Sequence, residues 1–455
     1  MTSTAHRPTS FMWRDAGALL ALAWPMIITY AGVLTINIVD TIMVGQYDSL
    51  HLAYFGVGLV PSNILWPVLI GLLLGVRVLV SNLYGAERFG ETGAVMWQAM
   101  GWALFLGLGG FAICAAGEQL LALSGQTPEI AERGGRIAFI AGLSLPFVAI
   151  NLTISFFLEG IRRPYPAMVI MLVSNVVNII ANYMLVYGHW GAPELGAEGA
   201  VWASFIVRSV QFAAYLTYIW CMHDEARYGI RRPSRRTRET GAQLRQIGYA
   251  GGLSMSVENG AFNALALFAG LIGIAAIGAH VINIMVFSLF FMFGLGVGMA
   301  TAVRVGNSYG ANDAAGVAYW AWLGLTIQTI LMVGVAAFVY VFSESLAAFF
   351  TADPAVMGLA AAMVAYSAVA MIFDTGQSLF AISLRARGDT WMPTLVHAFS
   401  YLGVMIPVAW FACFHLDRGV FGLVDAMIVG SVLPFSLLAW RYRRLDRRGY
   451  IPAAA

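Results

Sequence analysis

Charged residues are scarce in this 455-residue chain. Asp, Glu, Lys and Arg make up 11% of it, and lysine is absent, so all 25 basic residues are arginine. A soluble domain carries about 25% charged residues, and a soluble chain of this length would need several domains. So few charges could not cover the surfaces of those domains. The 60% hydrophobic content also excludes a disordered chain.

Cysteine is rarer still. The three cysteines (Cys114, Cys221 and Cys413) each lie inside an apolar run, which excludes a secreted scaffold held together by disulfides. The net charge is only +2, and the basic residues cluster in two short segments, which argues against a nucleic-acid partner. These absences leave a polytopic membrane protein, surrounded by membrane lipid.

Long apolar runs, by contrast, are abundant. A helix that crosses a bilayer needs about 20 mostly apolar residues. Twelve stretches satisfy this, at approximately 17–43, 52–80, 93–116, 134–157, 165–188, 197–222, 247–271, 278–303, 316–341, 356–383, 392–415 and 419–440. They are continuous, unlike the alternating segments of about ten residues in outer-membrane barrels. The sequence therefore predicts an all-α integral membrane protein with twelve transmembrane helices.

The positions of the arginines predict the orientation. One cluster lies between the sixth and seventh spans, a second follows the twelfth, and seven further arginines fall on the same side. These residues are Arg227, Arg231, Arg232, Arg235, Arg236, Arg238, Arg245; Arg441, Arg443, Arg444, Arg447, Arg448; and Arg7, Arg14, Arg88, Arg162, Arg163, Arg385, Arg387. The opposite loops, around 45–51, 117–130, 189–196 and 342–355, have none. The positive-inside rule places both termini and the central loop in the cytoplasm. The central loop itself is interpreted as a solvated linker, with lipid binding or regulation as the alternative.

The two halves of the chain resemble each other. Residues 82–86 (NLYGA) end the second span and residues 307–311 (NSYGA) end the eighth; residues 158–163 follow the fourth span and residues 384–389 follow the tenth. Six spans per half give both halves the same orientation, as in parallel repeats about an axis along the membrane normal. The predicted domains are an N-lobe (1–222), a basic cytoplasmic loop (223–246), a C-lobe (247–441) and a cytoplasmic tail (442–455).

This plan is common among secondary transporters, whose sites lie near the midplane between repeats. The sequence contains no GxxxxGK[ST] motif and no soluble domain that could hold a nucleotide. Any pumping is therefore expected to use an ion gradient.

Most of the 23 acidic residues lie in loops or at the ends of predicted spans, but three stand out inside spans: Asp40, Glu258 and Asp374, with Asp425 as a weaker fourth. A buried charge in hydrocarbon costs at least a few kcal/mol, so such residues are usually functional. Arginines at 77, 208 and 304 also fall in or near spans. Each could extend its head group to an interface, although Arg208 lies mid-span and could pair with an acid.

Asp40 has polar residues that could accompany it. Asn175, Asn178 and Asn182 form one stripe on the fifth span, and Ser204 follows the small residues that open the sixth. A carboxylate, amide oxygens and a hydroxyl suit a hard cation, so Na⁺ could bind at Asp40, Asn178 and Asn182. The carboxylate could equally take a proton. The alternative is that the Asn stripe only forms interhelical hydrogen bonds.

The second half offers Glu258 and Asp374, with Asn259, Asn263 and Gln377 nearby in sequence. These acids could attract a cationic substrate, bind the coupling ion or carry protons. The structural alternative is a helix-to-helix hydrogen bond made by a protonated acid.

Two further features have open interpretations. Pro25, early in the first span, could allow the helix to bend or could simply start it. Methionines and aromatics such as Met363, Met371 and Phe287 could line an adaptable cavity or pack in the interior.

Several of these motifs together resemble the multidrug and toxic compound extrusion (MATE) transporters, in particular their NorM-like bacterial branch. The resemblance covers roughly residues 15–445. It is carried by residues 39–45 (VDTIMVG), the two YGA marks, the run 174–183, the run 196–204 and residues 303–307 (VRVGN).

The resemblance implies twelve helices in two six-helix lobes related by a pseudo-two-fold axis along the membrane normal. It implies a monomer in the bacterial inner membrane that exports organic, mostly cationic and hydrophobic compounds in exchange for Na⁺ or H⁺. Asp40, Asn178, Asn182 and Ser204 match the N-lobe cation site, and Glu258 and Asp374 match the acidic pair of the C-lobe. Some NorM-like members have Tyr where this chain has Ala370, which weakens the case for a C-lobe cation site.

Other functions fit less well. A flippase of lipids or lipid-linked oligosaccharides from the same superfamily is the nearest alternative, but it would need a cationic cavity for pyrophosphate. An intramembrane enzyme is not expected, because no two of the seven histidines stand at metal-ligand spacing, and no resident cofactor is expected. A channel would not need a two-lobe repeat. The sequence does not decide between Na⁺ and H⁺.

Overall fold

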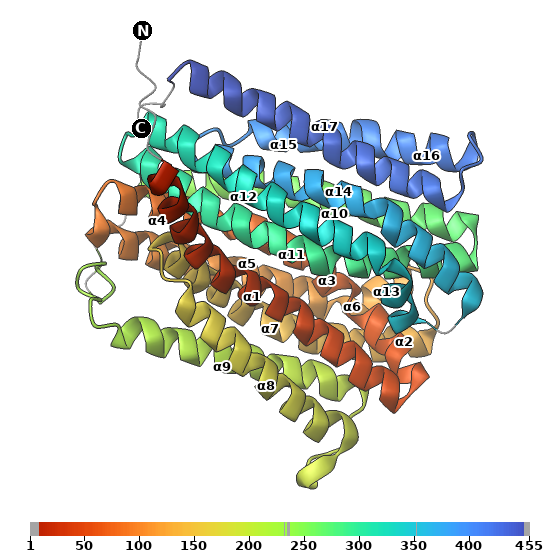
Figure 1. The fold of residues 1–455 in the computed structure, drawn as a ribbon. Helices are drawn as coiled ribbons and strands as arrows, with labels where there is room; N and C mark the ends of the chain where they lie inside the picture. The colour runs from red at the N-terminus through yellow and green to blue at the C-terminus, as the bar shows by residue number, and fades with distance from the viewer. Residues whose placement is uncertain (1–8, 232, 234–236, 352, 450–455) are drawn as a thin grey trace. The chain divides into compact units, whose positions relative to one another are not determined.

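The computed structural model describes residues 9–231, 233, 237–351 and 353–449, and every regular element within these ranges is a helix (Figure 1). The all-α prediction is therefore confirmed. Arg7, Arg232, Arg235 and Arg236, which contributed to the predicted orientation, lie outside the described residues.

Eleven spans in the described part of the chain are long and apolar enough to cross a membrane. They are formed by α1 (Thr9–Tyr47), α3 with α4 (Val60–Leu73, Gly75–Gly85), α5 (Phe89–Ala115), α7 (Pro128–Gly160), α8 (Tyr165–Tyr187), α10 (Arg238–Ile272), α11 (Ile274–Gly310), α12 (Ala314–Val341), α14 (Pro354–Ala386), α15 with η2 and α16 (Met392–His397, Ala398–Met405, Ile406–Phe414) and α17 (Val420–Arg447). The chain is thus a multi-pass membrane protein.

The predicted sixth span corresponds to α9 (Ala197–Cys221), a long helix in addition to these eleven spans. Its 25 residues suffice to cross a bilayer at 1.5 Å per residue. It is not among the eleven most apolar spans, because Arg208 and Gln211 in its middle lower its hydropathy. Both side chains are buried within the protein.

The predicted second span, 52–80, is not one helix. The structure divides this region into α2 (Ser49–Gly58), α3 and α4. The break before α3 precedes Pro61, which occupies the first turn of α3, where a missing N–H costs nothing. At Gly71, α3 approaches α10 so closely that a Cβ there would lie 2.5 Å from the carbonyl carbon of Gly251.

Three predicted loops also need correction. The segments 117–130 and 342–355 each contain a short helix, α6 (Gly117–Leu123) and α13 (Ser343–Phe350). The predicted basic loop 223–246 ends earlier, because α10 already begins at Arg238.

The arginine asymmetry is also less complete than predicted. Helix α7 begins at Pro128, before the predicted residue 134, so its first turns contain Arg133 and Arg136. Arg418 lies between α16 and α17. By the alternation of the helices, these three arginines fall on the side opposite the basic loop. The orientation itself stays a prediction.

The chain forms two compact units, each described here by itself. The N-lobe unit is Ile28–Ser256, and the C-lobe unit combines Met1–Ile27 with Val257–Ala455. Helices α1 and α10 each contribute residues to both units. The boundaries between the two units therefore fall inside helices. The sequence analysis had instead placed the boundary between the N-lobe and the C-lobe in the basic loop.

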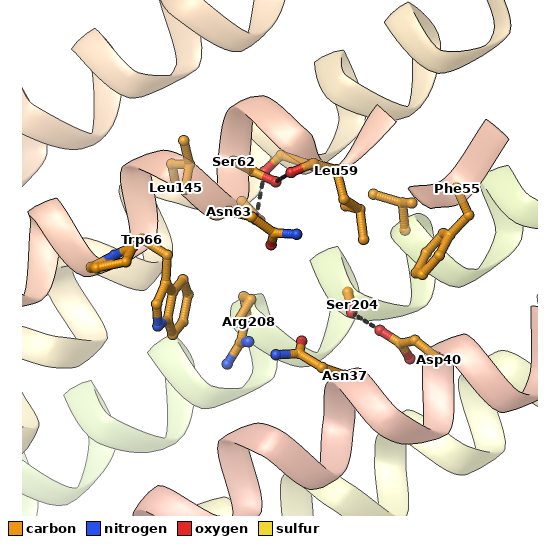
Figure 2. A pocket seen from close by; sticks show the side chains of 14 residues that line it. Asn37, Asp40, Phe55, Leu59, Ser62, Asn63, Trp66, Leu145, Ser204 and Arg208 are labelled. Carbon is orange, nitrogen blue, oxygen red and sulfur yellow. Dashed lines mark hydrogen bonds between the residues drawn. The ribbon is translucent and has the colours of Figure 1, made fainter. Parts of the chain in front are cut away.

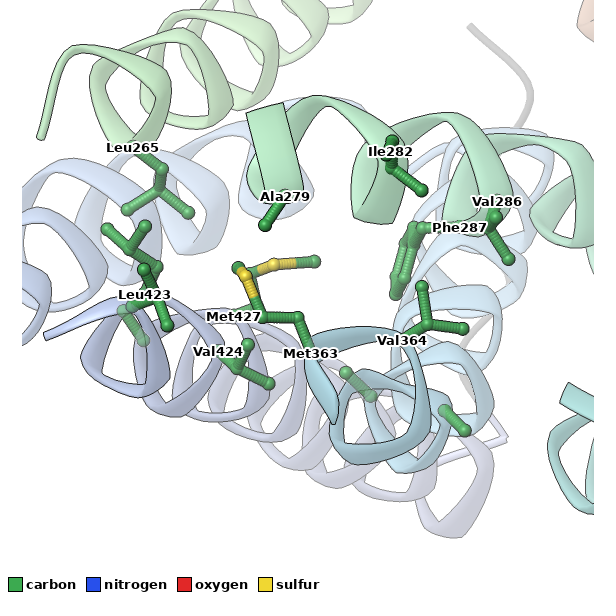
Figure 3. Close-up of a cluster of buried hydrophobic side chains, with 14 of the residues drawn as sticks. Leu265, Ala279, Ile282, Val286, Phe287, Met363, Val364, Leu423, Val424 and Met427 are labelled. Atoms are coloured by element: carbon green, nitrogen blue, oxygen red, sulfur yellow. The ribbon is translucent and has the colours of Figure 1, made fainter. Parts of the chain in front are cut away.

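In the N-lobe unit, α7 packs against α5 and α9, and α8 runs beside α9 as a hairpin that turns at η1 (His189–Gly191) (Figure 1). In the C-lobe unit, α11, α14 and α17 enclose the main apolar core (Figure 3). Met363 and Met371 are fully buried in that core and Phe287 is 5% exposed, so these three residues pack in the interior.

Candidate functional site

The N-lobe unit contains a cavity of about 350 Å³ bordered by α1, α2, α3, α7 and α9 (Figure 2). Its lining mixes polar and aromatic side chains. The lining residues are Asn37, Asp40, Phe55, Leu59, Ser62, Asn63, Trp66, Pro67, Ala141, Ser144, Leu145, Val201, Ser204 and Arg208. A cavity of this size falls at the lower end of the range for small-molecule sites.

Asp40 lines this cavity and is 4% exposed. Its Oδ1 accepts hydrogen bonds from Nδ2 of Asn178 at 2.8 Å and from Nδ2 of Asn182 at 2.7 Å. Its Oδ2 accepts from the Ser204 hydroxyl at 2.7 Å. Helices α1, α8 and α9 thus bring the four predicted N-lobe residues together, and three donors satisfy the carboxylate as an anion.

The side-chain amides of Asn178 and Asn182 face Asp40 with their nitrogens, whereas the predicted sodium site had their oxygens there. Oδ1 of Asn178 and Oδ1 of Asn182 are buried acceptors without a hydrogen-bond partner among the described residues. If either amide rotated by half a turn, its oxygen would lie beside the carboxylate in the place that its nitrogen now occupies. The donor set of one carboxylate, two amide oxygens and one hydroxyl therefore fits a hard monovalent cation.

The third residue of the Asn stripe has a different role. Asn175 Nδ2 donates to the backbone oxygen of Gly32 on α1 at 3.2 Å and to that of Met171 at 2.9 Å. This is the interhelical hydrogen bonding considered as the alternative for the whole stripe. It holds for Asn175, while Asn178 and Asn182 reach Asp40.

The C-lobe unit brings Glu258 of α10 and Asp374 of α14 into one buried cluster, where their negative charges repel each other. Asp374 Oδ1 accepts from the Ser431 hydroxyl at 3.3 Å and, at 3.5 Å, from Gln377 Nε2. Gln377 Nε2 also donates to the Tyr401 hydroxyl at 3.1 Å. The Tyr401 hydroxyl in turn is hydrogen bonded to Glu258, so a continuous chain of polar groups links the two acids.

Tyr401 was missed in the sequence. Ala370, where the resemblance led us to look for a tyrosine, is fully buried. A tyrosine hydroxyl nevertheless reaches the acids, because Tyr401 projects from η2, a π-helical turn. A tyrosine inside an otherwise apolar span was the available signal. Of the predicted neighbours, Asn263 is exposed and donates to its own helix at Asn259.

Two of the three intramembrane arginines do not extend to an interface. Arg77 is 1% exposed and forms an ion pair with Glu159, at 2.9 Å between Nη1 and Oε2. Tyr30 donates to the same carboxylate at 3.1 Å. Arg208 is 8% exposed and lines the cavity. The prediction that Arg77 snorkels was wrong, because an acid from α7 lies inside the lobe to pair with it.

Pro25 lies well inside α1, which begins at Thr9, and it is buried. The interpretation that it starts the helix was therefore wrong. Helix α1 continues through Pro25, and its bending stays a prediction.

Comparison with known proteins places the chain in a family. Residues 25–184 and 252–411 each match the family model MatE. Two matches to one model confirm the internal repeat predicted from the YGA marks.

Similar sequences cover nearly the whole chain. A probable multidrug resistance protein NorM of Caulobacter vibrioides is 34% identical over 444 residues, covering 97% of this chain and 94% of the relative. The multidrug resistance protein PmpM of Pseudomonas aeruginosa is 28% identical, covering 94% and 91%.

Among solved structures, the eukaryotic MATE transporter AtDTX14 has a TM-score of 0.87 at 18% identity, with 96% of this chain and 98% of the other covered. A MATE structure in a bent conformation has a TM-score of 0.84 at 19% identity, covering 95% and 96%. These likenesses show the fold, two repeated halves of transmembrane helices. The chain therefore belongs to the multidrug and toxic compound extrusion (MATE) family and resembles its NorM-like branch.

Proposed function

We propose that the protein is a cation-coupled antiporter that exports organic, mostly cationic and hydrophobic compounds through alternating access. Its relatives are named multidrug resistance proteins. We place it as a monomer in the bacterial inner membrane with both termini in the cytoplasm. It uses Na⁺ or H⁺ as the coupling ion and no resident cofactor.

The observation that carries this proposal is the buried Asp40 carboxylate at the edge of a polar cavity. An acid in this position is expensive in a membrane protein, and an acid that faces a ligand cavity usually handles cations or protons. Ser204, Asn178 and Asn182 hold it in place. The carboxylate can attract an organic cation when charged, and it can be neutralised by a proton or by Na⁺.

Coupling requires that the ion and the exported compound favour different states of the protein, because ligands without differential affinity shift no equilibrium. In the proposed cycle, the coupling ion neutralises Asp40, or the Glu258 and Asp374 pair, from the outside. The loss of negative charge weakens the binding of the organic cation. Bending of α1 at Pro25 accompanies release.

The C-lobe cluster supports a second role in the same cycle. Glu258 and Asp374 repel each other, so a bound proton or metal cation would relieve that repulsion. The polar groups of Tyr401 and Gln377 between them could relay a proton. A C-lobe site is therefore proposed beside the one at Asp40.

The test is transport of ethidium, a permanent organic cation, in proteoliposomes. An inward Na⁺ gradient or an inward proton gradient is imposed separately, and the ethidium movement in the opposite direction is measured. The proposal requires that at least one gradient drives ethidium against its own gradient. If neither does, and a fluorescent lipid instead moves between leaflets faster than in protein-free vesicles, the flippase alternative replaces the proposal.

A further inference from the structure

Arg385 is a fully buried arginine near the acidic cluster of the C-lobe unit. It lies about three turns after Asp374 on α14, so the two residues share one face of that helix. Its side chain is 2% exposed. A guanidinium so far removed from water is costly unless opposite charge and hydrogen bonds surround it.

The contacts of Arg385 leave most of its donors unused. Nη2 donates to the Thr394 hydroxyl at 3.5 Å, which is longer than a typical hydrogen bond, and Nε has no hydrogen-bond partner among the described residues. Arg387, by contrast, forms an ion pair with Asp446 at 2.7 Å. No ion pair holds Arg385 within the described part of the chain, but its charge and that of Glu258 attract each other. Arg385 therefore acts on the acid pair through its electric field.

Without a positive charge nearby, the acid pair would suit a divalent cation. Glu258 and Asp374 supply two carboxylates, and the hydroxyls of Ser431 and Tyr401 supply neutral oxygens beside them. Oε1 of Gln377 is a buried acceptor without a hydrogen-bond partner among the described residues, on the amide whose nitrogen contacts Asp374. Carboxylates together with neutral oxygens are the ligands that Mg²⁺, Ca²⁺ and Mn²⁺ prefer.

Arg385 changes the charge balance of this cluster. Two carboxylates and one guanidinium carry one net negative charge, which a single monovalent cation neutralises. The ring of His397 lies 5.5 Å from that of Tyr401, centre to centre, and the charge of Arg385 disfavours a second positive charge there. A divalent cation would leave the buried cluster with a net positive charge, which is costly inside a membrane.

We propose that Arg385 makes the C-lobe acid pair selective for a single monovalent cation and excludes divalent cations from it. Arg385 is thus a specificity-determining residue that touches neither acid. This inference rests on the proposed C-lobe site, and it adds a reason why that site would exchange one monovalent charge at a time.

The experiment measures Mn²⁺ binding, because free Mn²⁺ is counted directly by electron paramagnetic resonance. Purified full-length protein in detergent is titrated with Mn²⁺ in a sodium-free buffer at neutral pH. The variants are Arg385→Gln, which removes the charge, and Arg385→Lys, which keeps it. Arg385→Gln is also combined with Asp374→Asn, so that any new binding is assigned to the acid pair. Thermal unfolding of each variant establishes that the protein is folded.

We expect Arg385→Gln to lower the Mn²⁺ Kd by at least about tenfold, since a charge repels a divalent ion strongly in a poorly screened interior. Adding Asp374→Asn should remove the gained binding, and Arg385→Lys should bind Mn²⁺ as weakly as wild type. Arg444→Gln is the matched control in the same lobe unit, because Arg444 is exposed and stacks on Trp440. Its Mn²⁺ Kd should equal that of wild type.

An unchanged Mn²⁺ Kd in folded Arg385→Gln, or an equal gain in Arg444→Gln, would overturn the proposal. Wild type alone supplies a further test that needs no substitution of Arg385. Tighter Mn²⁺ binding by wild type than by Asp374→Asn would show that the acid pair already accepts a divalent cation. Failure of the proposed function looks different, because ethidium would then not move under either ion gradient in proteoliposomes, whereas Mn²⁺ binding in detergent would still report on Arg385.

Discussion

Among single residues, Asp40 has the most demanding environment. It is nearly inaccessible to water, both of its carboxylate oxygens accept hydrogen bonds, and the group borders a cavity. Asp425 provides a contrast. It forms an ion pair with Arg418 near the start of α17, and both side chains are partly exposed. The first position suits ion exchange and the second suits local stabilisation.

We expect Asp40→Asn and Asp374→Asn each to reduce ethidium efflux from whole cells at least tenfold. The amide keeps the size of the side chain but cannot change its charge, so neither ion binding nor cation attraction survives. Asp425→Asn is the control and should retain most of the efflux, since a partly exposed ion pair contributes at most about 1 kcal/mol. Full efflux in both Asp40→Asn and Asp374→Asn would refute the assignment.

The Asn stripe offers a second comparison between residues. Asn182→Ala removes a donor to Asp40 and should change the ion concentration that gives half-maximal efflux by at least fivefold. Asn175→Ala removes one interhelical hydrogen bond, to the backbone oxygen of Gly32 on α1, and one bond to Met171 within α8; it should cost about 0.5–1 kcal/mol of stability. Its ion dependence should stay within twofold of wild type. An equal change in ion dependence for both variants would contradict the separate roles.

Much of the N-lobe site could be predicted at this scale. Asn178 and Asn182 share a helical face, and a carboxylate in an apolar run signals function by itself. The direction of the amide groups could not be predicted, because it depends on what else surrounds Asp40. The partner of Arg77 was likewise hidden, since Glu159 lies 82 residues away in sequence and only the fold brings α4 and α7 together.

At the scale of single elements, the helical segment η2 brings Tyr401 to the acidic cluster of the C-lobe unit. The π-helical segment η2 interrupts the eleventh span, and π-helical turns often occur at functional sites. It places the Tyr401 hydroxyl beside both Glu258 and Gln377. The span could be predicted from its hydropathy. Tyr401 could be noticed as a tyrosine inside an apolar run, but its contact with the two acids could not be predicted, because nothing in residues 392–415 indicates a π turn.

Tyr401→Phe removes this hydroxyl and keeps the ring. We expect ethidium efflux to fall about tenfold, because the polar connection between Glu258 and Asp374 is broken. Tyr366→Phe is a suitable control, since its hydroxyl donates to Asp425, outside the Glu258 and Asp374 cluster. Normal efflux by Tyr401→Phe would show that the hydroxyl serves packing alone.

Three helices of the N-lobe unit meet at a buried ion pair. Arg77 of α4 contacts Glu159 of α7, and Tyr30 of α1 bonds to both. Nε and Nη2 of Arg77 have no hydrogen-bond partner among the described residues, so the guanidinium depends heavily on this one acid. The pair therefore ties α1, α4 and α7 together.

Glu159→Gln would leave the Arg77 charge buried without its counter-ion. Breaking such a pair typically costs about 3–5 kcal/mol, and we expect a loss of about 3 kcal/mol in the free energy of unfolding, measured by denaturant titration in detergent. Glu132→Gln disrupts the exposed pair with Arg136 and should cost less than about 0.5 kcal/mol. Comparable losses in the two variants would contradict a structural role for the buried pair.

The whole molecule consists of two similar halves that have diverged in charge. Glu159 in residues 158–163 corresponds to Arg385 in residues 384–389, and both side chains are buried. Asp40 lies in the N-lobe unit, whereas Glu258 and Asp374 lie in the C-lobe unit. The repeat could be predicted because its marks recur at one offset along the chain.

The unit boundaries could not be predicted in the same way. They fall inside α1 and α10, where the hydropathy of the sequence changes little. Which part of a continuous helix packs with which lobe is decided by contacts between distant residues. The break in the second predicted span was easier to predict from the sequence, since Pro61 lies in the first turn of α3.

The most direct test of the central claim, that Asp40 exchanges a small cation for an organic one, is reciprocal flux. If exchange of the two cations is coupled and reversible, an organic cation moving one way must be able to drive the coupling ion the other way. In proteoliposomes without an imposed ion gradient, an ethidium gradient should drive opposite movement of Na⁺ or H⁺, and Asp40→Asn should abolish that movement. Ethidium movement with no ion flux in wild type, or equal ion flux in Asp40→Asn, would contradict the claim.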